Sequence, residues 1–366
     1  MLTLDDFDFT YPEELVAHRA LEDRAAAKLL IRKSSGEIFH SSIRLASSSI
    51  PDNALVIYND TKVIPARIEG SFPSGGRFEI FLLNCQSSTD SESTWEIIGK
   101  PLTKLKSRSP VDLGNGLSVH LEPSPKDERF LLATFPLNQS ATISWLMQHG
   151  RMPLPPYIKR SRNADSLDHE DKSRYQTVYA QSEGSVAAPT AGLHFTREVM
   201  TSMGSKGIQW MPITLHVGGG TFLPVQSQNP SDHRMHEEWY QIPRSTLQAL
   251  QTAKKSGRCI VAVGTTSFRA LESFARDHGD SWIDLDSSQS SALCSTNIFI
   301  FPKHSTDRYI PKIPTAMFTN FHQPKSTLFM LISALIGVKE ARDLYKTALQ
   351  EKYRLFSYGD SSLLYF

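Results

Sequence analysis

The feature that most constrains the fold is a short, continuously apolar run, residues 259–263, which leads directly into Gly264, two threonines and Ser267. An apolar run without alternation is typical of a strand that is buried on both faces, as in a parallel sheet. A helix is expected from Phe268 to Asp277, after the Gly-Thr-Thr-Ser loop. A strand, a short loop and a helix in this order predict an α/β layer with buried parallel strands.

The residue pattern is different between about residues 66 and 135. Short alternating or β-rich runs follow one another there and are separated by turn residues; they are residues 78–83, 95–98, 117–121 and 130–135. Several short strands with turns between them predict a small barrel or sandwich. A helix over residues 141–149 should end at Gly150, where a proline-rich passage leaves this region.

These two residue patterns together define the predicted fold class. We expect a larger α/β domain, residues 1–67 and 151–366, with a small β-barrel-like domain, residues 68–150, inserted in it. The chain has 366 residues, 40% of them hydrophobic, and a formal net charge of +1. It can therefore bury a sizeable core, and it is neither strongly basic nor disordered in composition.

Composition also bears on location and chemistry. The acidic N-terminus lacks a signal peptide pattern, and the apolar stretch at residues 328–338 is far shorter than the roughly 20 residues of a membrane helix. The three cysteines, Cys85, Cys259 and Cys294, are widely separated. They suit reduced thiols in a cytoplasm and exclude the closely spaced trio of a radical iron–sulfur enzyme. A cytoplasmic protein is expected.

Two segments combine glycine with histidine. In residues 187–195, proline and glycine bracket Thr190 and lead to His194, which predicts a tight turn with two polar groups at its edge. In residues 214–222, His216 precedes three glycines, Gly218, Gly219 and Gly220, which let a ligand approach the backbone. Because a proline follows instead of a helix, the second segment does not match a dinucleotide-binding loop. A plain turn and a glycine-rich bulge are the structural alternatives.

Three further segments carry candidate reactive groups. Residues 232–238 place two histidines among carboxylates, which suits acid–base catalysis, metal ligation or a solvated surface. Residues 264–269 put hydroxyls and Arg269 at a helix N-terminus, which suits an anion or simple capping. In residues 319–324, Asn320 and His322 follow an expected strand and would either face a cleft or cap the next helix.

Basic residues gather at two places. The small domain carries one group without an intervening acid, and the linker carries another; they are Lys100, Lys104, Lys106 and Arg108, and Lys159, Arg160 and Arg162. Either group could follow nucleic-acid phosphates, although such runs are more often a solvated surface.

Read together, these segments resemble one family, S-adenosylmethionine:tRNA ribosyltransferase-isomerase of queuosine biosynthesis. The matching pieces run almost from end to end: residues 59–67, 152–157, 175–179, 187–195, 216–222, 264–269, 319–326 and 353–360. Departures are few: Gly219 stands where Ala is expected, Phe268 for Val, Gln323 for Leu and Glu237 for Ser. The family pattern favours Glu238 over Glu237 as the carboxylate that faces a site.

The resemblance implies a monomeric enzyme that transfers and isomerises the ribosyl part of S-adenosylmethionine. The acceptor is 7-aminomethyl-7-deazaguanine at the tRNA wobble position, and the products are epoxyqueuosine, adenine and methionine. The partners implied are this tRNA and S-adenosylmethionine as cosubstrate, with no cofactor, metal or membrane.

Site residues are expected in the matching segments. We expect acid–base catalysis from His194, His216, His236, Glu238 and His322. We expect substrate binding by Thr190, Gly218, Gly219, Gly220, Thr265, Thr266, Ser267, Arg269 and Asn320. The histidines are expected to converge on one cleft although they are distant in the sequence.

Two other functions remain open at this point. A S-adenosylmethionine-dependent tRNA methyltransferase would use the same cosubstrate and partner, but the chain lacks a strand, glycine loop and helix unit near its N-terminus. A non-catalytic RNA-binding protein would use the small β domain and its basic residues, leaving the histidine-rich and glycine-rich segments unexplained. Release of adenine from the cosubstrate separates the three.

Overall fold

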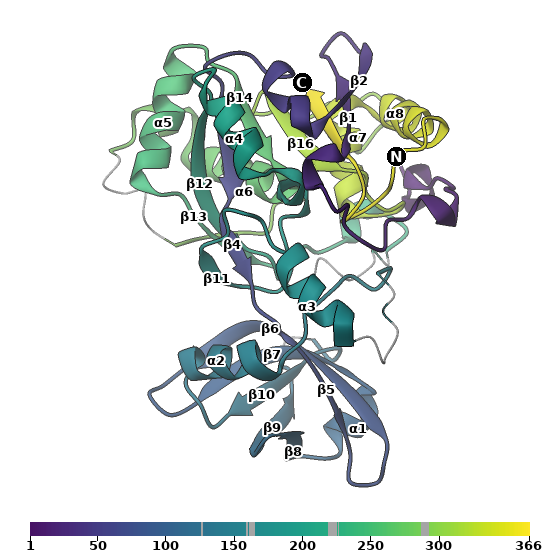
Figure 1. The fold of residues 1–366 in the computed structure, drawn as a ribbon, viewed down its shortest axis with the longest axis vertical. Coiled ribbons are helices and arrows are strands. Elements are labelled where there is room, and N and C mark those ends of the chain that lie inside the picture. Colours follow the sequence, from purple (N-terminus) through teal and green to yellow (C-terminus); the bar gives the residue numbers. More distant parts are fainter. Residues whose placement is uncertain (126, 159, 161–164, 219–224, 226, 287–292) are drawn as a thin grey trace.

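The computed structural model describes the whole chain except residues 126, 159, 161–164, 219–224, 226 and 287–292. Among the described residues the largest sheet has nine strands, in the order β15-β13-β12-β3-β14-β16-β17-β1-β2 (Figure 1). Its strands are β1 (Lys28–Arg32), β2 (Ile38–Ser42), β3 (Leu55–Asn59), β12 (Gln209–His216), β13 (Glu238–Gln241), β14 (Ile260–Val263), β15 (Cys294–Thr296), β16 (Ala316–Asn320) and β17 (Ser361–Tyr365).

The centre of this sheet is parallel, as the apolar run at residues 259–263 predicted. Strands β12, β3, β14 and β16 run in the same direction, and all four residues of β14 are buried. The following helix, α6 (Gly264–His278), begins earlier than predicted. Gly264 has a φ of 88°, a conformation that glycine tolerates, so the chain passes directly from strand into helix. The predicted Gly-Thr-Thr-Ser loop is therefore the first turn of α6.

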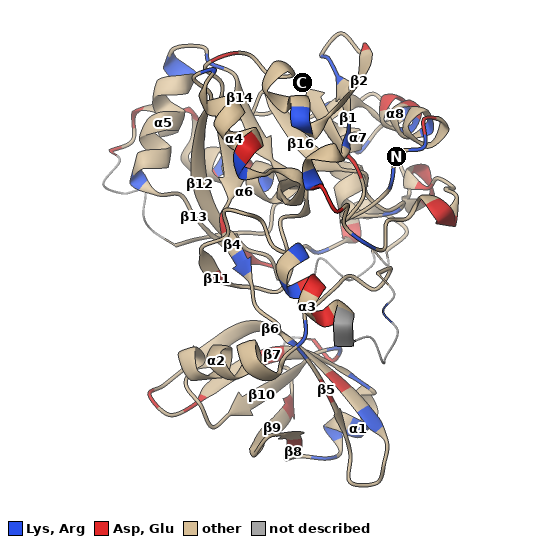
Figure 2. Ribbon diagram, in the orientation of Figure 1, with Lys and Arg blue, Asp and Glu red and all other residues tan. Residues whose placement is uncertain are grey.

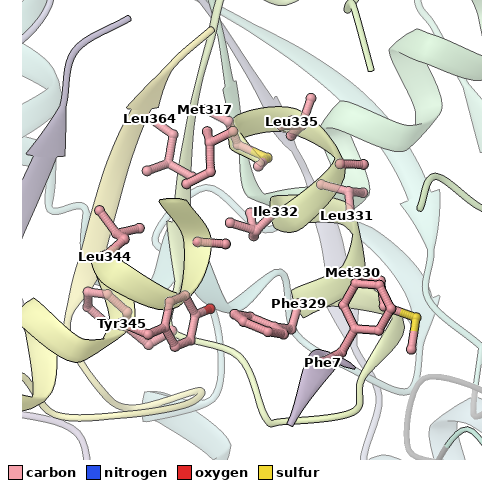
Figure 3. Packing of buried hydrophobic residues seen from close by; sticks show 14 of the residues in the cluster. Phe7, Met317, Phe329, Met330, Leu331, Ile332, Leu335, Leu344, Tyr345 and Leu364 are labelled. Carbon is pink, nitrogen blue, oxygen red and sulfur yellow. The ribbon is translucent and has the colours of Figure 1, made fainter. Parts of the chain in front are cut away.

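Helices cover both faces of the nine-stranded sheet. The helices are α4 (Arg197–Gly204), α5 (Arg244–Lys255), α6, α7 (Thr327–Ile336) and α8 (Val338–Gln350). Leu55 and Ile57 of β3 pack with α5 and α6 on one face, whereas Val56 packs with α4 on the other. This alternation is that of a strand buried on both sides. Figure 3 shows α7 and α8 packed against Met317 and Leu364 of β16 and β17.

A second sheet, with six antiparallel strands among the described residues, forms at the other end of the molecule (Figure 1). Its strands are β5 (Arg67–Ser71), β6 (Arg77–Ser88), β7 (Ser93–Lys100), β8 (Val111–Gly114), β9 (Leu117–Pro123) and β10 (Leu131–Phe135). The order is β5-β6-β7-β10-β9-β8, and the edge strands β5 and β8 approach each other, so the sheet is a nearly closed barrel with its own apolar core. The helices beside it are α1 (Leu102–Lys106) and α2 (Gln139–His149), and α2 ends at Gly150 as predicted.

Short elements connect the two sheets and complete the fold. Strands β4 (Thr61–Val63) and β11 (Ser182–Ser185) form a parallel pair, and helix α3 (Asp165–Arg174) lies nearby (Figure 1). The 3-10 helices are η1 (Leu4–Phe7), η2 (Glu13–Leu15), η3 (Arg24–Ala26), η4 (Ile43–Ser48), η5 (Thr190–His194), η7 (Pro230–Asp232) and η8 (Gly279–Asp284). None of the helices in the described parts of the chain is long and apolar enough to span a membrane.

Candidate active site

A cavity of about 530 Å³ lies at the carboxyl ends of β14 and β16. Several segments that are distant in the sequence form its wall, among them residues 155–157, 187–191, 217–218, 264–266 and 319–328. In open α/β sheets, ligands bind outside the carboxyl ends of the parallel strands. This cavity is therefore the candidate active site.

The first two turns of α6 form a wall rich in hydrogen-bond donors. Thr265, Thr266 and Arg269 line the cavity. The Thr266 hydroxyl and the Nη2 atom of Arg269 are both buried without a hydrogen-bond partner among the described residues. The amides of a helix N-terminus add partial positive charge. This wall can hold an anion.

Arg269 is held in place by Glu238 from β13. Its Nη1 atom donates to Glu238 Oε2 at 2.6 Å, and its Nε atom donates to the Ile298 carbonyl at 3.3 Å. The side chains of Arg269 and Glu238 are only 7% and 5% exposed. The sequence placed Glu238 at the site but did not reveal this ion pair. The pair orients the guanidinium and leaves Nη2 available.

The end of β16 contributes a second polar group. The Thr190 hydroxyl donates to Asn320 Oδ1 at 2.9 Å, and Asn320 Nδ2 lies 3.1 Å from His194 Nε2. Thr190 and Asn320 line the cavity. His194 lies behind Asn320 and borders a separate, much smaller cavity together with Arg24 and Arg354.

His322 lines the same cavity two residues beyond β16. Its Nε2 atom lies 2.7 Å from the Thr319 hydroxyl, and its backbone N–H donates to the Tyr345 hydroxyl at 2.8 Å. Burial lowers the pKa of His322 to about 3. The ring is therefore neutral at pH 7 and can accept a proton or a hydrogen bond.

His236 lines the cavity from the loop that precedes β13. Its ring meets Phe130, just before β10, edge to face with 5.8 Å between the ring centroids. His233 lines the cavity from the same loop, and its pKa is lowered, first by burial and then by His236 and Arg129. The histidine-rich segment thus lies between the cavity and the six-stranded sheet.

Several residues expected at the site lie elsewhere. The Nδ1 atom of His216 lies 2.8 Å from the Thr61 hydroxyl, and the Ser267 hydroxyl donates to the Val263 carbonyl at 2.9 Å. Neither residue, nor His194, is among the described residues that line the cavity. The expected convergence of the histidines on one cleft is therefore wrong for His194 and His216. The reason is that Asn320 lies between His194 and the cavity, and that the half-buried His216 is hydrogen-bonded to Thr61 of β4.

Gly218 is the glycine of the glycine-rich segment that lines the cavity in the described part of the chain, together with Val217. The expectation for Gly219 and Gly220 falls outside the described residues, as do Lys159 and Arg162 of the linker group.

Sequence reasoning missed the aromatic wall of the cavity. Tyr157, Tyr175, Phe321 and Phe356 line it, and the Tyr157 hydroxyl is hydrogen-bonded to Ser357. Burial raises the pKa of Tyr157 to about 12. These residues occur in pieces that matched the family, but an aromatic side chain in a sequence is indistinguishable from a core residue. Such a wall can stack on a flat heterocycle.

Metal ligation is one interpretation of the histidine-rich segment, residues 232–238. In the described residues, no cluster of three or more His, Cys, Asp or Glu side chains could hold a metal ion.

A mixed α/β protein with a donor-lined cavity at the carboxyl ends of its parallel strands has the architecture of an enzyme that binds a small molecule. Comparison with known proteins identifies the family. The model of the queuosine biosynthesis protein family matches residues 4–364, and the chain belongs to this family.

Curated relatives match over the full length. A protein of Cupriavidus metallidurans is 40% identical, covering 100% of this chain and 98% of that protein, and bears the name S-adenosylmethionine:tRNA ribosyltransferase-isomerase. A protein of Treponema denticola with the same name is 40% identical, covering 100% of both chains. The crystal structure of S-adenosylmethionine tRNA ribosyltransferase from Thermotoga maritima is similar, with a TM-score of 0.52 and 27% identity over 98% of this chain and 99% of that one.

Proposed function

We propose that this protein is a S-adenosylmethionine:tRNA ribosyltransferase-isomerase that works at the cavity between α6 and β16. The observation that carries the proposal is end-to-end similarity, at 40% identity, to relatives with that name. The acceptor is tRNA that carries 7-aminomethyl-7-deazaguanine. The products are epoxyqueuosine in the tRNA, adenine and methionine.

The α6 wall suits the amino-acid part of the cosubstrate. The methionyl carboxylate would accept hydrogen bonds from the amides of the first turn, from the Thr266 hydroxyl and from Arg269 Nη2. The last two groups are buried donors without partners among the described residues, which favours a ligand atom between them. Thr265 belongs to the same wall, and Gly218 lines the cavity from the end of β12.

The proposed chemistry begins at the ribose. The sulfonium charge acidifies the 5′ carbon, so a base can remove a proton from it. His322 is the proposed base because it lines the cavity and its ring is unprotonated at pH 7. His236, which also lines the cavity, is the proposed acid that assists loss of adenine. The aminomethyl nitrogen of the tRNA base supplies the nucleophile, and methionine leaves with the electron pair of the sulfonium–ribose bond. Thr190 and Asn320 bind polar groups of the substrate.

The six-stranded sheet is the proposed tRNA-binding part. We propose that residues 68–150 form a domain inserted in the larger one, residues 1–67 and 151–366, and that the enzyme is a cytoplasmic monomer. Figure 2 shows basic residues on α1. Lys104 and Lys106 are exposed there, with exposed Lys100 and Arg108 beside the helix. Lysine and arginine side chains at this spacing suit contacts with phosphates.

The test separates this reaction from methyl transfer and from binding alone. The protein is incubated with S-adenosylmethionine and tRNA that bears the aminomethyl-deazaguanine, and the small molecules are separated by chromatography. Free adenine and methionine should appear in proportion to modified tRNA, and only when that tRNA is present. S-adenosylhomocysteine would show a methyltransferase instead, and unchanged cosubstrate would show an RNA-binding protein.

A further inference from the structure

His194 is a buried histidine that the proposed reaction does not use. It closes the 3-10 helix η5, is only 5% exposed, and is separated from the cavity by Asn320. Its position rules out direct contact with a substrate in the cavity. Its contact with Asn320 connects it to the cavity wall.

The chemistry of the amide decides which atom donates in this contact. Asn320 Nδ2 can only donate, so the His194 Nε2 atom, 3.1 Å away, must be the acceptor. The ring proton therefore resides on Nδ1. A protonated His194 would place two donors against each other and break the contact.

The surroundings of His194 keep its ring neutral. Burial lowers its pKa to about 3, and the positive charges of Arg354 and Arg24 act in the same direction. Both arginines are themselves held by backbone carbonyls: Arg24 Nη1 donates to Gln176 at 2.6 Å, and Arg354 Nη2 donates to Tyr358 at 2.9 Å. Two fixed cations beside the ring make it a permanent acceptor at pH 7.

A permanent acceptor at His194 fixes the orientation of the Asn320 amide. Nδ2 points to His194 and to the Asp360 carbonyl, at 3.4 Å, while Oδ1 accepts from Thr190 at 2.9 Å. A carbonyl oxygen has two lone pairs, and Thr190 uses one of them. Asn320 lines the cavity, and the other lone pair can accept a hydrogen bond from a donor of a bound molecule that reaches it.

We infer that His194 is a positioning residue that, through Asn320, presents a hydrogen-bond acceptor to an N–H or O–H donor of the cosubstrate. This inference rests on the proposed function, because it takes S-adenosylmethionine as the molecule in the cavity. The donor is either the exocyclic amine of adenine or a ribose hydroxyl. His194 does not itself transfer a proton in the reaction.

The first measurement needs no turnover. Nitrogen-15 chemical shifts of the labelled protein should show His194 with its proton on Nδ1 and a bare Nε2 from pH 5 to pH 8. A ring that titrates near the ordinary value of about 6.5, or that has its proton on Nε2, overturns the inference. If this result is as expected and no adenine is released, the proposed function fails while the acceptor at His194 stands.

The second measurement uses two variants with binding and rate data. His194→Phe fills the space but cannot accept, whereas Gln in His194→Gln has a carbonyl that can. The Phe variant should weaken calorimetric binding of S-adenosylmethionine about tenfold and raise KM, with an unchanged pH–rate profile, and the Gln variant should restore most of the loss. A loss confined to kcat together with a missing limb in the pH–rate profile would make His194 a proton carrier. Unaltered binding in a folded Phe variant would make it a core residue only.

A cosubstrate analogue identifies the donor. S-inosylmethionine lacks the exocyclic amine of adenine. If Asn320 accepts a hydrogen bond from that amine, the analogue and the His194→Phe substitution each weaken binding. Combined, they weaken it no further than either does alone. If Asn320 instead accepts from a ribose hydroxyl, the losses of affinity caused by the analogue and by His194→Phe multiply. Should the Phe variant not fold, the same cycle is carried out with His194→Leu, whose smaller side chain also cannot accept a hydrogen bond from Asn320.

Discussion

Two clusters of polar side chains in this protein contain similar residue types but differ in whether their hydrogen-bonding groups have partners. One, the strand junction, consists of Asn59, Asp60, Thr61, Thr214 and His216, where β3 and β4 meet β12. Asn59 donates to the Leu215 carbonyl at 2.9 Å and accepts from the Leu215 amide at 3.0 Å. The Thr214 hydroxyl donates to Asp60 at 2.7 Å. In this cluster the polar groups bond to one another.

The other cluster lies at the cavity. There Thr266 and Arg269 keep buried donor atoms without partners among the described residues, although Arg269 also forms a buried ion pair. Proteins rarely leave such atoms unpaired unless water or a ligand meets them. Residue type therefore does not mark the site. What marks it is that two buried donors without partners lie together in the wall of one cavity, whereas the other such atoms of the described residues, for example the Tyr179 hydroxyl, do not line it.

The largest effect is expected at the strand junction. Replacing Asn59 by Ala leaves the buried N–H and C=O of Leu215 and the N–H of Thr61 without their partner. At about 1 kcal/mol or more for each group, the free energy of unfolding should fall by about 3 kcal/mol. Urea denaturation measures this, and KM of the folded variant should match the parent. A stable Asn59→Ala protein with an altered KM would place the junction in the active site.

The cavity should respond in the opposite way. Arg269→Lys keeps a charge for Glu238 but loses the second donor, so KM for S-adenosylmethionine should rise about 10- to 100-fold. The free energy of unfolding should fall by only about 1 kcal/mol, because the Ile298 carbonyl loses its donor while the charge opposite Glu238 is kept. Arg276→Lys is the matched control, because Arg276 lies on the same helix, is 47% exposed and pairs with Asp277. Equal KM values for the two lysine variants would show that Arg269 is structural only.

The sequence could predict the features that depend on local residue patterns, but not those that depend on which groups become hydrogen-bond partners in the fold. Hydrophobic patterning predicted β14, α2 and four strands of the six-stranded sheet, β6, β7, β9 and β10, because burial of apolar faces is a local signal. It did not predict the edge strands β5 and β8. Motif residues placed Thr190, Thr266, Arg269, Asn320 and His322 at one cavity. The ion pair between Glu238 and Arg269 and the contact of His216 with Thr61 were not predictable, because they depend on which strands become neighbours. The aromatic wall was missed because aromatic side chains serve core and cavity alike.

Acid should weaken the fold through His194. Its folded pKa of about 3 lies below the ordinary value of 6.5, so between these values the unfolded chain binds a proton that the folded chain does not. The stabilisation is complete above pH 6.5 and is lost as pH falls, by up to about 2 kcal/mol at pH 5. Urea denaturation at pH 7 and pH 5 should show a smaller loss for His194→Gln than for the parent. For comparison, burial also lowers the pKa of His216, but the negative charge of Asp60 partly offsets that effect. Equal losses in parent and His194→Gln would contradict the assigned pKa.

The smallest effect tests the comparison most directly, with two threonines in the first turns of neighbouring helices. The Thr266 hydroxyl in α6 has no partner among the described residues, whereas the Thr246 hydroxyl in α5 donates to the Pro212 carbonyl at 2.7 Å. Valine has nearly the same shape but no hydroxyl. Thr246→Val should therefore lose about 1 kcal/mol of unfolding free energy and retain its KM, because it leaves a buried carbonyl unpaired. Thr266→Val should keep or slightly gain stability, since a buried hydroxyl without a partner is unfavourable, while its KM for S-adenosylmethionine rises about three- to tenfold. If Thr266→Val instead loses stability like Thr246→Val and binds the cosubstrate as the parent does, the hydroxyl is satisfied within the protein and the α6 wall does not hold the carboxylate through it.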